Sequence, residues 1–393
     1  MFFYETLFTD ANYFTESFFL HVIYELVNYA FCVAIAITFF KLKYIAKEDL
    51  LAWIILFTTP FFFNYVLFDP ALFSDQRGYI NFISYIRENG YSGIDLSITG
   101  IEKLRTFGLE SSVILYSLIP MPMNITITSL AFMNKLLMFF LYVYMLRNTN
   151  NKNTILLFFI PSIILYSSLS LRDPLIIFFS SIFIISVIKD KIFIPIICLF
   201  LVLLLKTQNA IFLSLVLFGK WFFQADKRGP YLFAGAILLF GIIFQDFVLE
   251  NLVFFKYAFF LEDNLNYSSI DIRDNFFSAY DSIFHVIYDA LISLPGYLLL
   301  PYPWSVSSSL QLLQSIENIL LIVVLYFMIK TAAIKNFQLT FFLTFCMFVG
   351  LALYAFTIYN PGTGARYKIA HVIPFVFGFF YLAMSKPKDK FES

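Results

Sequence analysis

Charged residues are scarce in this sequence: lysine, arginine, aspartate and glutamate together make up 13% of its 393 residues. A soluble globular protein carries about 25% charged residues, and a chain with so few could not cover a compact fold with polar surface. Basic and acidic residues also cancel to a formal net charge of zero, so bulk charge predicts no partner. These absences exclude a water-soluble domain, a nucleic-acid-binding protein and a disordered chain.

Cysteines are few and nucleotide-binding motifs are missing. The three cysteines (Cys32, Cys198 and Cys346) lie inside apolar runs, which argues against a disulfide framework or a metal cluster. The sequence contains no P-loop, no G-x-G-x-x-G and no nucleophile elbow. We therefore expect no cofactor, and neither a primary pump nor a cytoplasmic nucleotide-sugar enzyme.

Long apolar runs dominate what is present, since 60% of the residues are hydrophobic and 21% are aromatic. A bilayer core of about 30 Å needs roughly 20 apolar residues per helix, so the sequence predicts an all-α, polytopic transmembrane bundle of about 11 spans. The spans are predicted at 17–40, 49–68, 126–146, 154–168, 174–188, 192–205, 207–223, 230–246, 317–330, 338–358 and 371–384. Two further stretches, 111–121 and 285–303, contain prolines and are predicted to dip into the membrane without crossing it.

Lysine and arginine between the spans set the orientation. Basic residues exceed acidic ones in alternate loops, which the positive-inside rule assigns to the cytoplasm. These loops carry Lys41, Lys43, Lys47, Arg147, Lys152, Lys189, Lys191, Lys220, Lys227, Arg228, Lys330, Lys335, Lys386, Lys388 and Lys390. This bias places the N-terminus outside and the C-terminus in the cytoplasm.

The chain is predicted to form a single integral membrane domain over 1–393. Residues 1–16 contain acids and no base, so no cleavable signal peptide is predicted. Two outer segments, 69–110 and 247–316, are long, whereas every inner loop is short. Room for a reaction in the aqueous phase therefore exists only on the outer side.

Charged residues next to the apolar runs are the best candidates for function, because charge near hydrocarbon costs about 2.5–3.5 kcal/mol at a helix centre. Arg172 and Asp173 join two predicted spans with almost no loop, at the outer face. Asp173 can cap the next helix and Arg172 can pair with it or with lipid phosphate. Alternatively, the planar guanidinium of Arg172 binds a phosphate group in a membrane-lined cleft.

Lys206, Gln208 and Asn209 break an apolar stretch that otherwise runs over 192–218. A helical hairpin that turns at the outer face explains this break structurally. The same polar cluster could instead hydrogen-bond a sugar or a diphosphate, because inward-facing polar groups in a bundle often mark a substrate path.

Arg366 and Lys368 follow a segment rich in proline and glycine, 360–364, just before the last predicted span. The segment predicts a tight turn with exposed backbone N–H groups. Basic residues on the outer side run against the topology preference. Anion binding by this turn would explain them, and so would contact with outer-leaflet phosphates.

Three further candidates lie in the outer segments. Asp75 and Arg77 precede an apolar stripe at 79–86 that predicts a short helix along the membrane surface, so Asp75 could be a general base at a cavity mouth. A solvated acid in a solvated loop is the plainer interpretation. Trp304 lies in an aromatic-proline turn that belongs to an interfacial belt or stacks on a sugar. Acids and aromatics at 246–283 either clamp sugar rings or form a solvated cap.

With these residues in place, the chain resembles the O-antigen polymerase (Wzy) group and the related exopolysaccharide polymerases. The resemblance is carried by Leu171-Arg172-Asp173-Pro174-Leu175 between two helices, by Asp75 ahead of an aromatic-rich segment, by Pro303-Trp304, and by the late Gly362-Thr363-Gly364-Ala365-Arg366-Tyr367. It implies a GT-C-like integral membrane glycosyltransferase in a bacterial inner membrane, working on undecaprenyl-diphosphate-linked repeats at the periplasmic face. Many relatives place two acids together in the first outer loop, whereas Asp75 is followed by Gln76 and Arg77, and no metal is expected.

The resulting hypothesis is an O-antigen or polysaccharide repeat-unit polymerase. The expected partners are the undecaprenyl-diphosphate-linked oligosaccharide and the bilayer, with a chain-length regulator and a flippase as further candidates and no nucleic acid. The expected catalytic residues are Asp75, Asp173 and Arg172, and the expected substrate-binding residues are Arg77, Lys206, Gln208, Asn209, Arg366, Lys368 and Trp304. The alternatives are a glycosyltransferase that adds one sugar from a polyprenyl-phosphate donor, and a flippase for lipid-linked oligosaccharides.

Overall fold

The computed structural model describes residues 18–67, 101–119, 121–122, 128–225, 243–263, 282–306, 309–358 and 361–385, with isolated positions that include 76, 79, 235 and 280. In this part of the chain the secondary structure is helical and contains no strand, which confirms the all-α prediction. The predicted span 230–246 and the outer residues 69–100 lie largely outside it.

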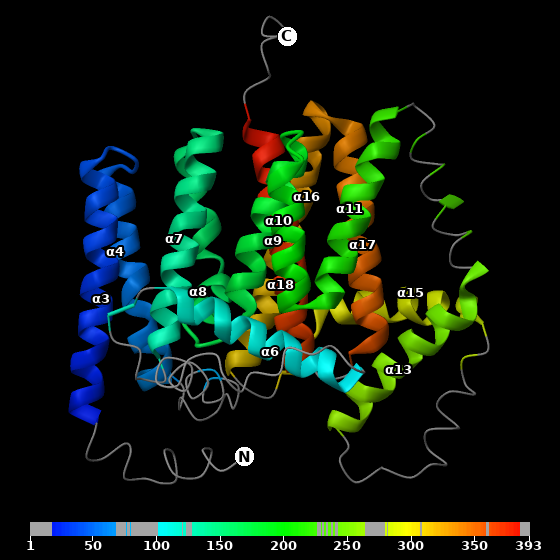
Figure 1. Ribbon diagram of the computed structural model, residues 1–393, viewed down its shortest axis with the longest axis horizontal. Helices are drawn as coiled ribbons and strands as arrows, with labels where there is room; N and C mark the ends of the chain where they lie inside the picture. Colours follow the sequence, from blue (N-terminus) through cyan, green and yellow to red (C-terminus); the bar gives the residue numbers. More distant parts are fainter. Residues whose placement is uncertain are drawn as a thin grey trace, which may run out of the picture. The chain divides into compact units, whose positions relative to one another are not determined.

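The chain divides into two compact units. The first comprises Met1–Phe179, Phe200–Thr207 and Ser385–Ser393, and the second comprises Ser180–Leu199 and Gln208–Met384. Each unit is built from long apolar helices and one or more helices that lie across them (Figure 1).

Helices of different lengths build the first unit. They are α3 (Phe18–Lys41), α4 (Lys47–Phe61) with its π-helical extension η1 (Phe62–Leu67), α7 (Ser129–Thr149), the 3-10 helix η3 (Lys152–Phe159), α8 (Pro161–Ser167), and parts of α9 (Asp173–Ile188) and α10 (Phe193–Leu205). One predicted span, 154–168, is thus two short helices. Pro161 explains the break, because it lacks an N–H and suits the first turn of α8.

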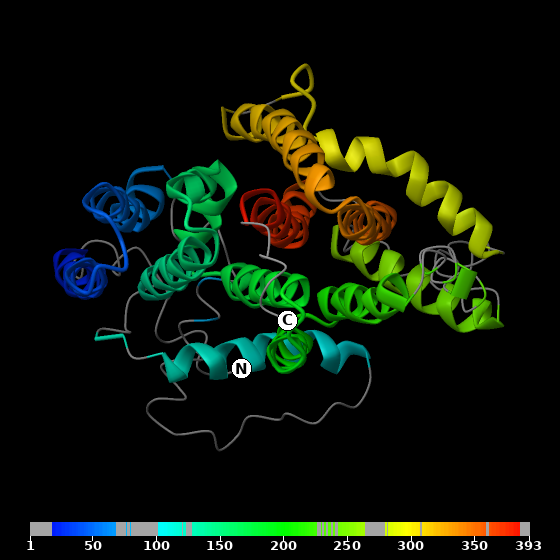
Figure 2. The same ribbon diagram turned by 90° about the horizontal axis from the view of Figure 1, so that it is seen from above.

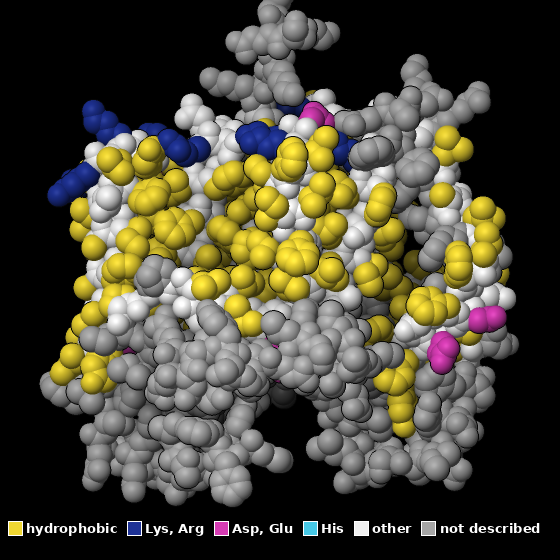
Figure 3. Space-filling view, in the orientation of Figure 1, with side chains coloured by type: hydrophobic (Ala, Val, Ile, Leu, Met, Phe, Trp, Pro, Cys, Tyr) yellow, Lys and Arg dark blue, Asp and Glu magenta, His cyan; other side chains and the backbone are white. Residues whose placement is uncertain are grey.

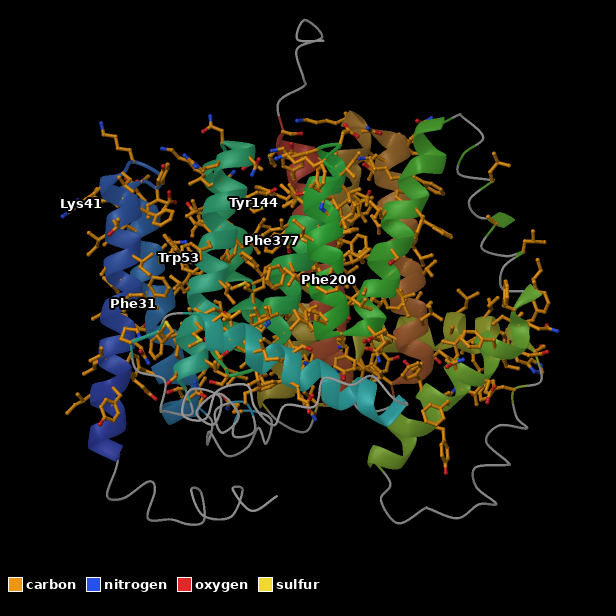
Figure 4. The ribbon with its side chains drawn as sticks, in the orientation of Figure 1. Phe31, Lys41, Trp53, Tyr144, Phe200 and Phe377 are labelled. Atoms are coloured by element: carbon orange, nitrogen blue, oxygen red, sulfur yellow. The ribbon has the colours of Figure 1, made fainter. Side chains whose placement is uncertain are left out.

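An aromatic core joins α4 to α7 and η3 in the first unit. Trp53, labelled in Figure 4, is 1% exposed. Its ring packs against those of Phe139, Tyr142 and Phe158, with centroids 5.3–5.7 Å apart. Rings this large remove much apolar surface from the surroundings, so they fix the spacing of the helices that carry the site described below.

The helix α6 (Ile101–Leu118) lies crosswise to α7 in the first unit, as both views show (Figures 1 and 2). Its second half covers the predicted dipping stretch 111–121. Ser112 and Tyr116 of α6 are fully buried, so this half of α6 packs onto the long helices and brings polar side chains against them.

The second unit contains α11 (Thr207–Ala225), α13 (Gln245–Asp263), α15 (Ile283–Leu299), α16 (Ser309–Lys335), α17 (Phe337–Thr357) and α18 (Pro361–Met384). α15 lies crosswise to α16 and α17 (Figures 1 and 2). It covers most of the other predicted dipping stretch, 285–303. The described part of the predicted outer segment 247–316 is therefore largely helical.

Within the described residues, five helices are long and apolar enough to cross a membrane, which supports a membrane protein with transmembrane helices. They are Val22–Lys41, Ser129–Thr149, Gln311–Lys335, Phe337–Thr357 and Gly362–Met384, with shorter apolar helices at Asp173–Ile188, Phe193–Leu205 and Ile283–Leu299. Hydrophobic side chains cover the flanks of the long helices (Figure 3). Most of the apolar window of α7 (78%) and of α18 (83%) is buried, so these two helices form the centres of their units.

The start of α18 corrects one prediction. The last span was expected at 371–384, after a tight turn at 360–364, but the helix already begins at Pro361. Proline lacks a backbone N–H, and an N–H in the first turn of a helix has no intrahelical acceptor, so proline suits the first helical position. Gly364 also lets α18 pass close to Tyr297, because a Cβ there would lie 3.2 Å from the Tyr297 ring. Arg366 and Lys368 therefore belong to the first two turns of the helix.

Candidate functional site

A buried turn at residues 168–172 links α8 to α9 in the first unit. Asn134 of α7 holds its backbone, because the amide nitrogen donates to the carbonyl oxygens of Leu169 (2.8 Å) and Leu171 (2.9 Å). The Tyr116 hydroxyl of α6 lies 2.8 Å from the same Leu171 oxygen and 2.6 Å from Asn134 Oδ1. Burial raises the pKa of Tyr116 well above its usual range, so the phenol keeps its proton and acts as a donor.

Side chains from α4 and from the first outer segment hold the other side of this turn. Asn64, in the π-helical extension of α4, donates to the Ser168 carbonyl at 2.8 Å. Gln76 accepts the Ser170 N–H at 2.7 Å, and the hydroxyls of Thr59 and Ser168 lie 2.7 Å apart. A buried backbone group left without a partner would cost about 1–3 kcal/mol, so these contacts make one backbone conformation strongly preferred.

Arg172 extends from the end of this turn. Its side chain is half-buried, and Nη1 donates to the carbonyl oxygen of Leu205 at 3.3 Å. Leu205 ends α10, where carbonyls lack intrahelical partners and attract a guanidinium. Gly108 of α6 lies against both groups, since a Cβ there would be 2.7 Å from the Leu205 oxygen and 2.8 Å from Nη1. The two polar breaks predicted near 172 and 206 therefore meet.

Two buried lysines flank the same turn. Lys206 directly follows Leu205 and is 5% exposed. Lys135 of α7 is 2% exposed and donates to the Ile164 carbonyl at 3.1 Å, an oxygen that also accepts the Ser168 N–H at 3.1 Å. Lys135 is absent from the predicted site residues, although a lysine inside an apolar span is a signal that could have found it.

Asp173 is the first residue of α9 and is 2% exposed. A carboxylate in this first turn is favourably placed against the positive end of the helix dipole. Such burial suits the capping and orienting role that the sequence left open for Asp173. Asp75 and Arg77 lie outside the described residues. The side chain of Gln76, between them, accepts the Ser170 N–H of the turn.

In the second unit, Asn209 lies near the start of α11. Its Oδ1 accepts the hydroxyl of Tyr354 at 2.6 Å, and the side chain is 3% exposed. This bond ties α11 to α17. Gln208 beside it is half-buried. Of the predicted polar cluster, Lys206 thus belongs to the first unit, and Gln208 and Asn209 belong to the second.

Lys368 of α18 is 2% exposed and binds the end of α15. Its ammonium donates to the carbonyls of Tyr297 (3.4 Å) and Leu298 (3.1 Å), and to Asn318 Oδ1 at 2.7 Å. Helix C-termini carry partial negative charge, so a cation at this position stabilises α15. Arg366, two residues earlier, is half-buried in the first turns of α18.

Trp304 lies after α15 and is 82% exposed. Its ring stacks on that of Tyr302, with centroids 5.1 Å apart and planes 6° from parallel. The pair forms an exposed aromatic platform, a geometry that serves both sugar stacking and an interfacial belt.

Among the described residues, no group of three or more His, Cys, Asp or Glu side chains is placed to hold a metal ion. Comparison with known proteins finds no family, no curated protein and no solved structure that matches the chain.

Proposed function

We propose that the protein is a membrane glycosyltransferase that polymerises undecaprenyl-diphosphate-linked saccharide repeats at the periplasmic face of a bacterial inner membrane. In this proposal the chain is a GT-C-like bundle of about 11 spans. The supporting observation is the contact between Arg172 and the carbonyl of Leu205, the residue before Lys206. In the proposal, Arg172 and Lys206, which come from two separate polar breaks in the sequence, form one cationic site next to the buried turn.

The proposed reaction exchanges one glycosidic bond for another. The acceptor hydroxyl attacks the anomeric carbon of the donor sugar, and the bond from that carbon to the diphosphate oxygen breaks with its electron pair. Arg172 and Lys206 stabilise the negative charge that grows on the departing diphosphate. The hydroxyl proton passes to a carboxylate, for which Asp75 remains the first candidate because Asp173 is buried at its helix start.

Rigidity is what makes this arrangement suitable for catalysis. Asn134 and Asn64 fix the backbone that carries Arg172, so little reorganisation is needed when charge develops. Water is largely excluded around Lys206, where the interaction between opposite charges is stronger than at a surface. Loss of one preorganised donor of this kind costs about 10²–10³-fold in rate.

The test is complementation of a deletion strain, with surface polysaccharide read on a gel. Arg172→Ala is expected to abolish or strongly shorten the ladder of long chains, and Arg172→Lys to restore it only in part, because a lysine cannot reproduce the planar fork. Arg147→Ala is the matched control. Arg147 lies at the far end of α7, with its guanidinium 4.0 Å from the Tyr44 ring centroid.

Membrane levels of each variant are measured on immunoblots of the same cells. Ladders of wild-type length and intensity from Arg172→Ala, at normal protein level, would remove the basis of the proposal. Movement of labelled lipid-linked oligosaccharide by the purified protein without chain growth would favour the flippase alternative.

A further inference from the structure

A second cluster of ionisable side chains lies in the second unit, where α13 and α15 pack on α17. The ammonium of Lys256 lies 4.6 Å from the centroid of the Tyr280 ring and 4.1 Å from that of Phe356, and it donates to the Tyr280 hydroxyl. Its nitrogen is also 3.6 Å from Asp289 Oδ2. Burial lowers the pKa of Lys256, while the Asp289 carboxylate opposes this shift.

The cluster orients one carboxylate. Asp289 Oδ2 accepts the Tyr280 hydroxyl at 2.9 Å, so both Tyr280 and Lys256 act on the same oxygen. The other oxygen, Oδ1, has no partner among the described residues, and the Asp289 side chain is 41% exposed. Behind it, Val286 and Ala290 of α15 pack into a buried apolar cluster with Phe356, which fixes the face of the helix that bears Asp289.

This geometry favours one class of ligand. Lys256 already supplies a positive charge, so a further cation would gain little at Asp289. An anion would be repelled by the carboxylate, and the described residues offer no set of metal ligands here. A neutral hydroxyl fits, because a carboxylate oxygen makes a strong charge-assisted hydrogen bond with an O–H donor.

We propose that Asp289 is a saccharide-binding residue that accepts hydroxyl groups of the acceptor glycan on Oδ1. Tyr280 and Lys256 are positioning residues that hold the carboxylate in its orientation. The proposal rests on the proposed function, since the sequence predicts that the segment 247–316 lies on the outer side, where the glycan would be. It adds a site for sugar hydroxyls to the diphosphate-binding groups and the base proposed above.

The experiment measures saccharide binding by purified protein in lipid nanodiscs. The probe is oligosaccharide released by mild acid from the surface polysaccharide of the host strain, titrated while ligand resonances are followed by saturation-transfer NMR. Asp289→Asn is expected to weaken binding by about tenfold or more, because the charge-assisted bond becomes an ordinary one. Glu48→Gln, the corresponding carboxylate-to-amide change at an exposed position on α4, is expected to bind like the wild type.

Tyr280→Phe provides a second variant. It keeps the ring against Lys256 and loses only the hydroxyl, and it should weaken binding while the thermal midpoint changes little. Wild-type affinity in Asp289→Asn, or a lowered thermal midpoint with no change in affinity, would overturn the proposal. The cluster would then only hold α13 against α15. No binding by the wild type would overturn it too. The proposed function fails separately, by unchanged ladders in Arg172→Ala.

Discussion

Substitution of Gly108 by alanine tests whether α6 seats Arg172 against the end of α10. An added Cβ would lie 2.7 Å from the Leu205 carbonyl oxygen and 2.8 Å from Arg172 Nη1. The first neighbour is backbone and cannot rotate away, so either α6 moves or Arg172 leaves its 3.3 Å bond to Leu205. Overpacking of this kind costs about 1–3 kcal/mol.

Helix propensity opposes this cost, because alanine stabilises a helix interior by about 1 kcal/mol relative to glycine. The expected net loss of stability for Gly108→Ala is therefore about 0–2 kcal/mol. Activity should fall further than stability does, since the displaced group is the proposed diphosphate ligand. Gly235→Ala is the matched control, because a Cβ at this helical glycine meets nothing within 4 Å.

The assay combines thermal unfolding in detergent with the length of polysaccharide made in the complemented deletion strain. Gly108→Ala should shorten the ladder and lower the unfolding midpoint modestly, whereas Gly235→Ala should keep both at or above wild-type values. If Gly108→Ala were as stable and as active as Gly235→Ala, the close packing of α6 on Arg172 and Leu205 would be refuted.

Two further substitutions test the hydrogen bonds that hold each unit. Asn134→Leu removes two hydrogen bonds to the turn carbonyls and the acceptor for Tyr116. It should lower the free energy of chemical unfolding by about 2–4 kcal/mol. A change below about 0.5 kcal/mol would mean that Asn134 does not hold the turn. Lys368→Met removes the donor that binds the end of α15. It should lower the thermal midpoint and leave the affinity for saccharide and diphosphate unchanged. An unchanged midpoint with weakened affinity would instead make Lys368 a substrate ligand.

The sequence predicts α9, α10 and α11 closely because polar breaks and a proline mark their ends. The spans expected at 174–188, 192–205 and 207–223 appear as α9, α10 and α11 within two residues at each end. Asp173 and Pro174 suit a helix start, and Lys206 interrupts an otherwise continuous apolar run. These signals are local, so they can be recognised in the sequence without knowledge of the tertiary packing.

The start of α18 could not be predicted in this way. Proline and glycine usually mark turns, but Gly364 allows a helix to pack closely against Tyr297. Only the tertiary structure shows that a large ring lies there. The same holds for Lys368, whose acceptors lie about 50–70 residues away in sequence.

The residues that hold the turn at 168–172 could also not be predicted from the sequence. Asn64 and Asn134 are single amides inside apolar runs, and a sequence does not say which carbonyls they meet. Their partners, the carbonyls of Ser168, Leu169 and Leu171, lack intrahelical bonds only because the chain breaks between α8 and α9. A buried polar side chain near a predicted helix break is the pattern that could have pointed to them.

The most direct test of the central claim is the affinity of the purified protein for undecaprenyl diphosphate, measured by native mass spectrometry for the wild type, Arg172→Gln, Lys206→Gln and the double variant. We predict that each single change weakens binding about tenfold or more, and that the two effects are not additive because the groups share one site. Equal affinity in all four proteins would contradict a diphosphate site at Arg172 and Lys206.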